Sequence, residues 1–319
     1  MANSVYPAQG GATGLTEAAS FIPEIWSDET KVAYEMNLVA APLVRNISMV
    51  GKKGDKMHIP APTRGAVTAK AENTAVTIQG NTEGTVDIDI DQHYEYSRFI
   101  EDIVGVQALD SMRQFYTKDA GYAMATQVDT SVLERGKFLG DDNGSGSDWV
   151  HSNSFYADAS TGLTAYAVDT VVTGDVVTAA IIRAMIKELD DNDVPMMDRF
   201  WIIPPSVKAT LLGISDFISA DFVNGRPTET GLLGDVYGCQ VYMTNNCPIS
   251  ETAGDNAAGG EVRASLMAHP DAIVLATQMD VRSQTQYKQE WLADLLTVDS
   301  IYGVHEYQQE AGIVLNVNS

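Results

Sequence analysis

The residues from Thr85 to Phe99 carry the pattern that most limits how this chain can fold. Apolar and acidic residues alternate strictly from Thr85 to Asp91, which predicts a strand with one buried face and one solvated face. The pattern continues through two tyrosines to Phe99, so the strand would cover about 15 residues, or roughly 50 Å. Strands usually have about 5–6 residues. Together with the glycine-punctuated residues before it, this long strand predicts a two-stranded arm over 51–99 that reaches out of a body.

Such an arm has little core of its own. An isolated two-stranded hairpin is only marginally stable in water. The arm therefore has to lie on something else, most simply a neighbouring subunit.

A long helix is expected directly after this arm, from about Asp102 to Arg135. The segment contains no proline, and Gly136 is a plausible end. A broad apolar stripe runs along it: Leu109, Met112, Tyr116, Ala120, Ala123, Met124, Val128 and Val132. Later in the segment the stripe residues are spaced four apart, which exceeds the helical period of 3.6, so the stripe winds around the helix axis. The helix is therefore expected to meet more than one partner.

The rest of the chain alternates between shorter elements. Residues 1–26 read as an extended arm, and a helix capped by Ser27 or Asp28 should follow it. A second helix is predicted from Val176 to Leu189 with Asp175 as its cap. The remaining predictions are a buried strand over 200–203, a short helix through Leu212, a strand over 238–244, and strands over 272–277, 281–296, 298–307 and 312–317.

Charge and hydropathy exclude several classes of protein. The 319 residues allow about two domains or one large one, and 45% hydrophobic residues exclude a largely disordered chain. Twenty Lys and Arg against 43 Asp and Glu give a net charge of −23, a field that repels phosphate backbones and argues against direct duplex binding. No apolar run approaches the roughly 18 residues of a membrane helix, and the first residues do not resemble a signal peptide. The expectation is a protein made and kept in a cytosol, without a membrane.

A search for catalytic chemistry finds no familiar signature. The sequence has no GxSxG, GxxxxGK[ST], GxGxxG or HExxH pattern, and no two of its five histidines have ligand spacing. Cys239 and Cys247 do not form a CxxC and are expected to be free thiols. Residues 141–152 resemble part of a calcium loop, but Ser152 stands where a bidentate Glu is needed. We therefore predict no enzymatic activity, no catalytic residue, no cofactor and no metal site.

The order of the elements resembles the major capsid proteins of tailed phages, the Hong Kong 97-like fold. An N-terminal arm, a glycine-punctuated two-stranded loop, a long helix, a small α/β region and long final strands occur in that family's order. The residues from Gly234 to Asn245 look like its glycine-then-strand motif. The resemblance implies an α+β fold divided as follows: N-terminal arm 1–50, E-loop 51–99, P-domain with spine helix 100–165, A-domain 166–280, and P-domain strands returning to the A-domain 281–319.

The resemblance also implies a function. The protein would self-assemble as hexamers and pentamers into an icosahedral shell around phage double-stranded DNA, without binding that DNA specifically. It would belong to the virion capsid and be assembled in the host cytoplasm. The arm is too short for the assembly domain of some members, so the chain looks podophage-like. A separate scaffolding protein, a portal protein and a possible cement protein would be its partners.

Four charged residues of the predicted E-loop are our candidates for contacts between subunits: Arg64, Lys70, Glu72 and Glu83. Charged residues on an exposed arm need partners or water, so plain solvation stays open for each. Some family members form a covalent crosslink between a Lys and an Asn. Lys70 lies in the predicted E-loop, but no local sequence signature supports such a crosslink. We therefore predict that none forms.

Three other hypotheses remain at this point. An encapsulin, a cellular nanocompartment shell of the same fold, would be expected to keep an inner cargo-binding groove, which we cannot identify. An α/β enzyme with a convergent site would show turnover that is lost with one pocket residue. A calcium-dependent adhesive module would use residues 141–152.

Overall fold

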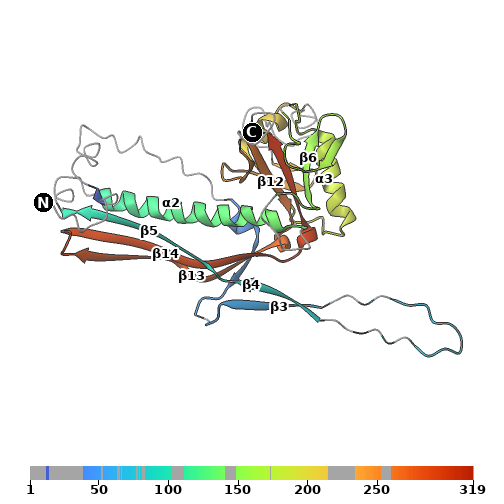
Figure 1. Cartoon of the computed structure of the whole chain (residues 1–319), viewed down its shortest axis with the longest axis horizontal. Coiled ribbons are helices and arrows are strands. Elements are labelled where there is room, and N and C mark those ends of the chain that lie inside the picture. Colours follow the sequence, from blue (N-terminus) through green and yellow to red (C-terminus); the bar gives the residue numbers. More distant parts are fainter. Residues whose placement is uncertain are drawn as a thin grey trace.

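The computed structural model describes residues 12–13, 39–51, 53–62, 65, 67–76, 78, 80, 83–102, 111–140, 149–172, 174–214, 234–252 and 260–318. The described strands form a five-stranded sheet, an eight-stranded sheet and a two-stranded sheet. Figure 1 shows an elongated molecule in which the first sheet, the second sheet and the hairpin occupy separate regions. The helix predicted after Ser27 lies outside the described residues.

The five-stranded sheet and one helix together form the elongated part of the molecule. Its strand order is β1 (Ala12–Thr13), β5 (Gln92–Glu101), β14 (Ala293–Glu306), β13 (Ile273–Lys288) and β2 (Arg45–Ser48). Helix α2 (Ser111–Glu134) runs alongside it (Figure 1). Buried Tyr116, Ala120 and Met124 of α2 pack against Leu296 and Val298 of β14. The predicted long helix is therefore confirmed over this range, and its apolar stripe faces the sheet.

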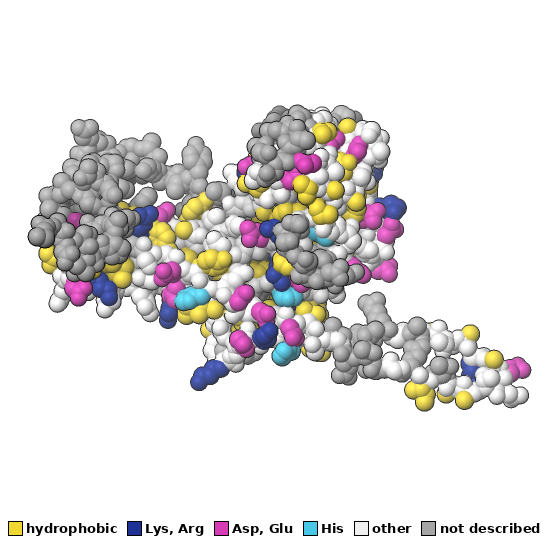
Figure 2. All heavy atoms as spheres, viewed as in Figure 1, with side chains coloured by type: hydrophobic (Ala, Val, Ile, Leu, Met, Phe, Trp, Pro, Cys, Tyr) yellow, Lys and Arg dark blue, Asp and Glu magenta, His cyan; other side chains and the backbone are white. Residues whose placement is uncertain are grey.

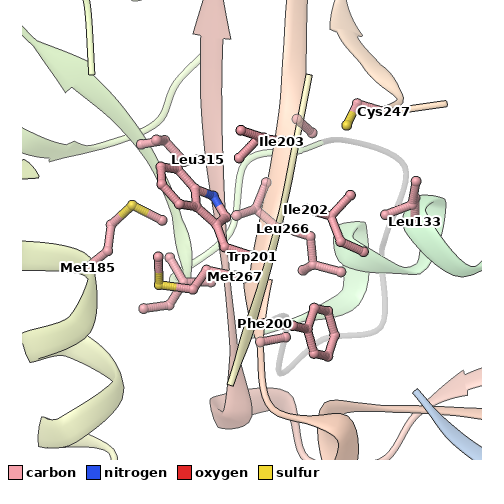
Figure 3. Close-up of a cluster of buried hydrophobic side chains, with 14 of the residues drawn as sticks. Leu133, Met185, Phe200, Trp201, Ile202, Ile203, Cys247, Leu266, Met267 and Leu315 are labelled. Atoms are coloured by element: carbon pink, nitrogen blue, oxygen red, sulfur yellow. The ribbon is translucent and has the colours of Figure 1, made fainter. Parts of the chain in front are cut away.

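The eight-stranded sheet carries most of the core. Its strand order is β7 (Gly162–Ala165), β6 (Ser154–Asp158), β15 (Gly312–Asn318), β12 (Val262–Ala268), β8 (Phe200–Ile203), β10 (Cys239–Met243) and β9 (Asp235–Val236), and β11 (Ile249–Glu251) pairs with β12. Helices α3 (Ala179–Asp191) and α4 (Pro205–Leu211) belong to the same region. Trp201 is fully buried at the centre (Figure 3), and its indole Nε1 donates a hydrogen bond to Ser265 Oγ at 2.7 Å. The predicted buried strand over 200–203 is confirmed.

The hairpin consists of β3 (Lys56–Pro62) and β4 (Glu83–Asp89), paired antiparallel from Lys56↔Asp89 to Pro62↔Glu83. We call β3, β4 and the residues between them the hairpin arm. It projects away from the two larger sheets (Figure 1). The predicted two-stranded arm is thus confirmed.

The prediction of one continuous strand from Thr85 to Phe99 is wrong. The chain leaves β4 at Asp89 and enters β5 at Gln92, where it joins a different sheet. At this junction the backbone passes so close to Gly303 of β14 that a Cβ there would lie 2.2 Å from the Asp89 carbonyl oxygen. The break lies where the chain passes a strand that comes more than 200 residues later in the sequence, so no local pattern reveals it.

Two other predicted elements differ from the structure. Helix α3 begins after Thr178, whose hydroxyl accepts the Ile181 N–H, while the carboxylate of Asp175 accepts the N–H groups of Ala159 and Val172. The strand expected over 281–296 is two strands, because the chain turns between β13 and β14 over 289–292. That turn contains neither Gly nor Pro, which are the usual sequence signals.

The predicted domain limits fall at particular places in these sheets. The limit at 280 lies inside β13, and β6 and β7 of the segment 100–165 pair into the eight-stranded sheet. The division into named domains stays a prediction.

Candidate assembly surfaces

The root of the hairpin arm is anchored on the long sheet by an apolar cluster. Ile88 of β4 is fully buried against Val274 and Ala276 of β13, with Met57 and Ile59 of β3 packed around them. Aspartates on the other side of β4 face basic residues of β3. The ion pair with Asp89 raises the pKa of Lys56, and a hydrogen bond with His58 lowers the pKa of Asp87. The alternation seen in the sequence thus places one face on the sheet and the other in solvent.

The free end of the arm exposes apolar side chains. Val67, Val76 and Ile78 are 103%, 70% and 90% exposed, and Figure 2 shows hydrophobic side chains gathered at this end of the molecule. Lys70 and Glu72 lie in the same exposed stretch. Completely burying a Val or Ile side chain is worth about 1.5–3 kcal/mol. The end of the arm is therefore a surface that gains from being covered by another molecule.

The structure places two of the four predicted contact residues. Lys70 and Glu72 lie on the exposed end of the arm. Glu83 is the first residue of β4, paired with Pro62, and its side chain lies outside the described residues, as does Arg64. The role of these four residues in contacts between subunits stays a prediction.

A groove separates the arm from the region of the eight-stranded sheet. It has a volume of about 1130 Å³ and is lined by 85–87 of β4, by 192–195 after α3, and by 305–311 between β14 and β15. Four carboxylates occur along these walls, those of Asp87, Asp193, Glu306 and Glu310. Asp87 pairs with His58, and Glu306 accepts a 2.7 Å hydrogen bond from Arg135 Nε. The lining is polar and acidic, which favours basic partners over nucleic acid.

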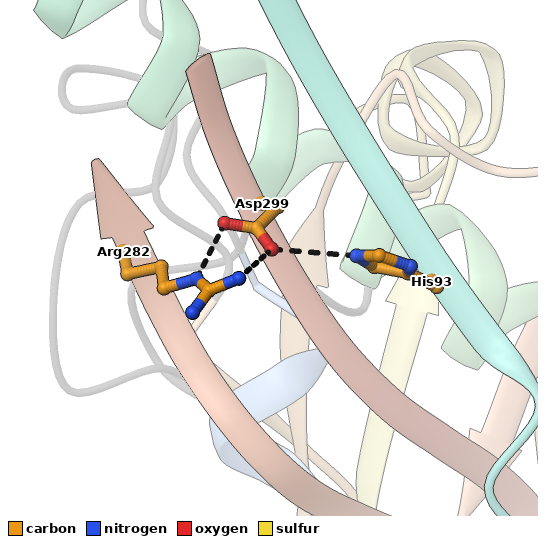
Figure 4. A network of polar contacts seen from close by, with 3 residues as sticks. All are labelled: His93, Arg282 and Asp299. Atoms are coloured by element: carbon orange, nitrogen blue, oxygen red, sulfur yellow. Dashed lines mark hydrogen bonds and ion pairs between the residues drawn. The ribbon is translucent and has the colours of Figure 1, made fainter. Parts of the chain in front are cut away.

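The long sheet carries a polar network that no sequence motif indicated. Arg282 of β13 donates two hydrogen bonds to the Asp299 carboxylate of β14, at 2.8 and 2.9 Å, and His93 Nε2 of β5 lies 3.3 Å from the same carboxylate (Figure 4). Arg282, and then His93, hold the pKa of the Asp299 carboxyl below its usual value. Arg282 and Asp299 are cross-strand partners, so this network joins three strands at one level of the sheet.

Acid should remove the contribution of this network. Because the pKa of folded Asp299 is lowered, its contribution to stability is present above the ordinary Asp value of about 4 and is lost as the pH falls through the folded value. We expect Arg282→Gln to lower the thermal midpoint of the unassembled protein at pH 7, and the difference from the unsubstituted chain to shrink below about pH 4. Thermal unfolding monitored by circular dichroism at several pH values would measure it. Lys56→Gln, which breaks an ion pair that is half exposed on both sides, is the control and should change the midpoint little. A pH-independent difference for Arg282→Gln would contradict this account.

A second buried carboxylate fixes the chain at Val39 and Ala41, shortly before β2. Asp129 of α2 is 1% exposed and accepts the backbone N–H groups of Val39 and Ala41, at 2.7 and 2.9 Å. A carboxylate that accepts two backbone donors makes strong, charge-assisted hydrogen bonds. The sequence signal was weak, because Asp129 stands one position after an apolar stripe residue and resembles an ordinary solvated residue.

The described residues offer little for metal or thiol chemistry. Within them, no group of three or more His, Cys, Asp or Glu could hold a metal ion. Cys239 and Cys247 are buried free thiols, as predicted, and burial raises the pKa of Cys247 to about 12. Residues 141–148 of the possible calcium loop lie outside the described residues, and Ser152 donates its hydroxyl to the Gly140 carbonyl. No described helix is long and apolar enough to span a membrane.

Comparison with known families tests the shell hypothesis. A family model described as phage capsid protein matches residues 43–316. The chain belongs to this family. The match covers the hairpin arm, the long helix and, apart from β1, the strands of both large sheets, so the capsid protein was predicted correctly from the order of its elements. It is a structural major capsid protein, and the match does not favour the encapsulin hypothesis. No curated protein matches the chain.

Solved structures show the same fold. A chain of Mycobacterium phage Che8 is 21% identical, with a TM-score of 0.70 over 92% of the capsid protein and 97% of that chain. The capsid structure of cyanophage P-SCSP1u gives 16% identity and a TM-score of 0.69, over 99% and 100% of the two chains. The capsid asymmetric unit of cyanophage Pam1 gives 11% and 0.68, over 100% and 99%. The predicted α+β, Hong Kong 97-like fold is thus confirmed over almost the whole chain.

Proposed function

We propose that copies of this capsid protein associate as hexamers and pentamers, and that these close into an icosahedral shell around phage double-stranded DNA. The observation that carries the proposal is the hairpin arm. Its root is anchored in an apolar cluster, but Val67, Val76 and Ile78 at its free end are 70–103% exposed. Repeated copies that cover one another's arms would bury these side chains at every interface. Stability would then come from summed contacts rather than from one tight site.

The charge of the chain supports a passive relation to DNA. A net charge of −23 repels phosphate, so packaged DNA would lie inside the shell without adhering to it. We further propose a separate scaffolding protein, a portal protein and a possible cement protein as partners, with assembly in the host cytoplasm. A structural protein of this family needs no cofactor, and the absence of enzymatic activity stays a prediction.

Electron microscopy tests the proposal directly. The protein would be expressed alone and then together with its scaffolding protein, and both preparations examined by negative stain. Closed polyhedral shells, or rings of five and six subunits, are the expected result. A uniform monomer in both preparations at high protein concentration would reject the proposal.

A further inference from the structure

In the part of the chain that the structure describes, the outer half of β13 is an open strand edge. On the side away from β14, β2 pairs with β13 only beside Val274–Thr277, and among the described residues no strand continues that pairing. Every residue from 280 to 287 is exposed, including Val281 at 54% and Tyr287 at 44%. An open edge presents a row of unpaired N–H and C=O groups, which is a template for a further strand.

From Arg282 onward, this edge lacks the features that usually prevent pairing. It contains no proline, and the one charged residue between Val281 and Tyr287 is Arg282, which is already paired with Asp299. The bulges of β13 lie between Thr277 and Arg282, so the second one falls at Asp280 and Val281, and the residues from Arg282 to Lys288 are in regular register with β14. Natural proteins that keep such an edge free protect it with charges, prolines or bulges.

The sequence of the edge is complementary to itself. In an antiparallel pair of two copies centred on Gln284, Arg282 of one copy faces Gln286 of the other within the regular stretch, and at the bulge Asp280 and Val281 come opposite Lys288 and Tyr287. Opposite charges and an aromatic residue beside a β-branched one are favourable cross-strand pairs. Ser283 then faces Thr285, which is a hydrogen-bonding pair, and no like charges stand opposite each other. A shift of the centre would lose the pairing of Asp280 with Lys288.

We propose that two copies of the capsid protein pair through this edge, antiparallel and about a two-fold axis at Gln284, so that their long sheets join into one continuous sheet. A two-fold axis makes the same patch serve both partners, which is what a self-complementary strand requires. The inference rests on the proposed function, because it specifies one contact between copies in the shell. Arg282 can take part without losing its partner, since Asp299 lies on the opposite strand within the same copy.

Cysteine crosslinking tests the register of this pairing. In Gln284→Cys the two thiols would lie on directly opposed residues, whose Cα atoms are about 4.5–5.5 Å apart, a distance compatible with a disulfide. In the matched control, Gln286→Cys, the two thiols would be four residues apart along the strands, or roughly 13 Å, which is too far. The native cysteines are 1% and 2% exposed and should contribute little background.

The experiment uses the full chain, both assembled and unassembled, under mild oxidation and followed by non-reducing gel electrophoresis. We expect at least about fivefold more covalent dimer with Gln284→Cys than with Gln286→Cys. A mixture of Val281→Cys and Tyr287→Cys chains should give a heterodimer, while neither chain alone should give a homodimer.

The outcomes separate this inference from the proposed function. Shells in which Gln284→Cys forms no more dimer than Gln286→Cys would overturn edge pairing and leave the shell proposal intact. Dimers of Gln284→Cys without shells would support edge pairing and reject the shell. If Gln284→Cys forms a disulfide only with a chain that carries Lys70→Cys, the end of a neighbouring hairpin arm occupies the edge, and the self-pairing is wrong.

Discussion

Capsid protein carrying both Val67→Asp and Ile78→Asp is expected to fold normally and to form no shells. The two side chains are 103% and 90% exposed in the single chain, so the substitutions remove no contact within it. Exposed substitutions usually change the free energy of unfolding by about 0.5 kcal/mol or less. The unassembled variant should therefore keep its thermal midpoint and circular dichroism spectrum.

The effect on assembly should be large because the loss recurs at every interface. Burial of two such side chains contributes about 3 kcal/mol or more, and each 1.4 kcal/mol is about a tenfold change in an association constant. Each contact should weaken by at least about two orders of magnitude. An introduced carboxylate adds a further penalty, because a buried unpaired charge is strongly unfavourable.

Sedimentation and negative-stain microscopy would measure this loss, and a conservative pair provides the control. Val67→Ile with Ile78→Val keeps both the apolar surface and the total number of carbon atoms, so that variant should still assemble. If the aspartate variant formed shells as readily as the unsubstituted protein, the end of the arm would not be an assembly surface.

Local sequence patterns predict much of this architecture. The apolar stripe of α2 and the alternation of β4 follow from the helical period of 3.6 and the strand period of 2, and both faces were assigned correctly. The exposure of the arm was also predictable, since a two-stranded arm that reaches out of a body has little core of its own.

The remaining features depend on strands that meet only in the folded chain. The network at Asp299 exists only because β5, β14 and β13 pair in one particular register. His93, Arg282 and Asp299 are far apart in the sequence and form no motif there. Asp175 appeared to be a helix cap, but its carboxylate is used by the N–H groups of Ala159 and Val172. Long-range hydrogen bonds of this kind override local propensity, and the open edge of β13 is visible only when the strand order is known.

The second large effect on stability is expected at Gly303 of β14, which the junction between β4 and β5 passes closely. In the structure, a Cβ at Gly303 would lie 2.2 Å from the Asp89 carbonyl oxygen and 3.0 Å from the Ile90 Cα. Both are backbone atoms, so no side chain can rotate away to make room. Gly303→Ala should push the junction of β4 and β5 off β14 and weaken the anchorage of the hairpin arm at Ile88. Overpacking of this kind costs about 1–3 kcal/mol, and an unyielding backbone contact belongs at the upper end.

Two measurements on the unassembled protein would distinguish this crossing from a general glycine effect. Urea unfolding should show a lower midpoint for Gly303→Ala, and hydrogen exchange should accelerate at the Ile90 amide, which donates to the Asp55 carbonyl at 2.9 Å. The matched control is Gly121→Ala, because Gly121 lies on the exposed side of α2 with no atom within 4 Å of an added Cβ. That substitution should stabilise the protein by roughly 0.5–1 kcal/mol, since alanine favours a helix. Equal stability of Gly303→Ala and the unsubstituted protein would show that the arm does not depend on this close approach, and that the bend between β4 and β5 has another cause.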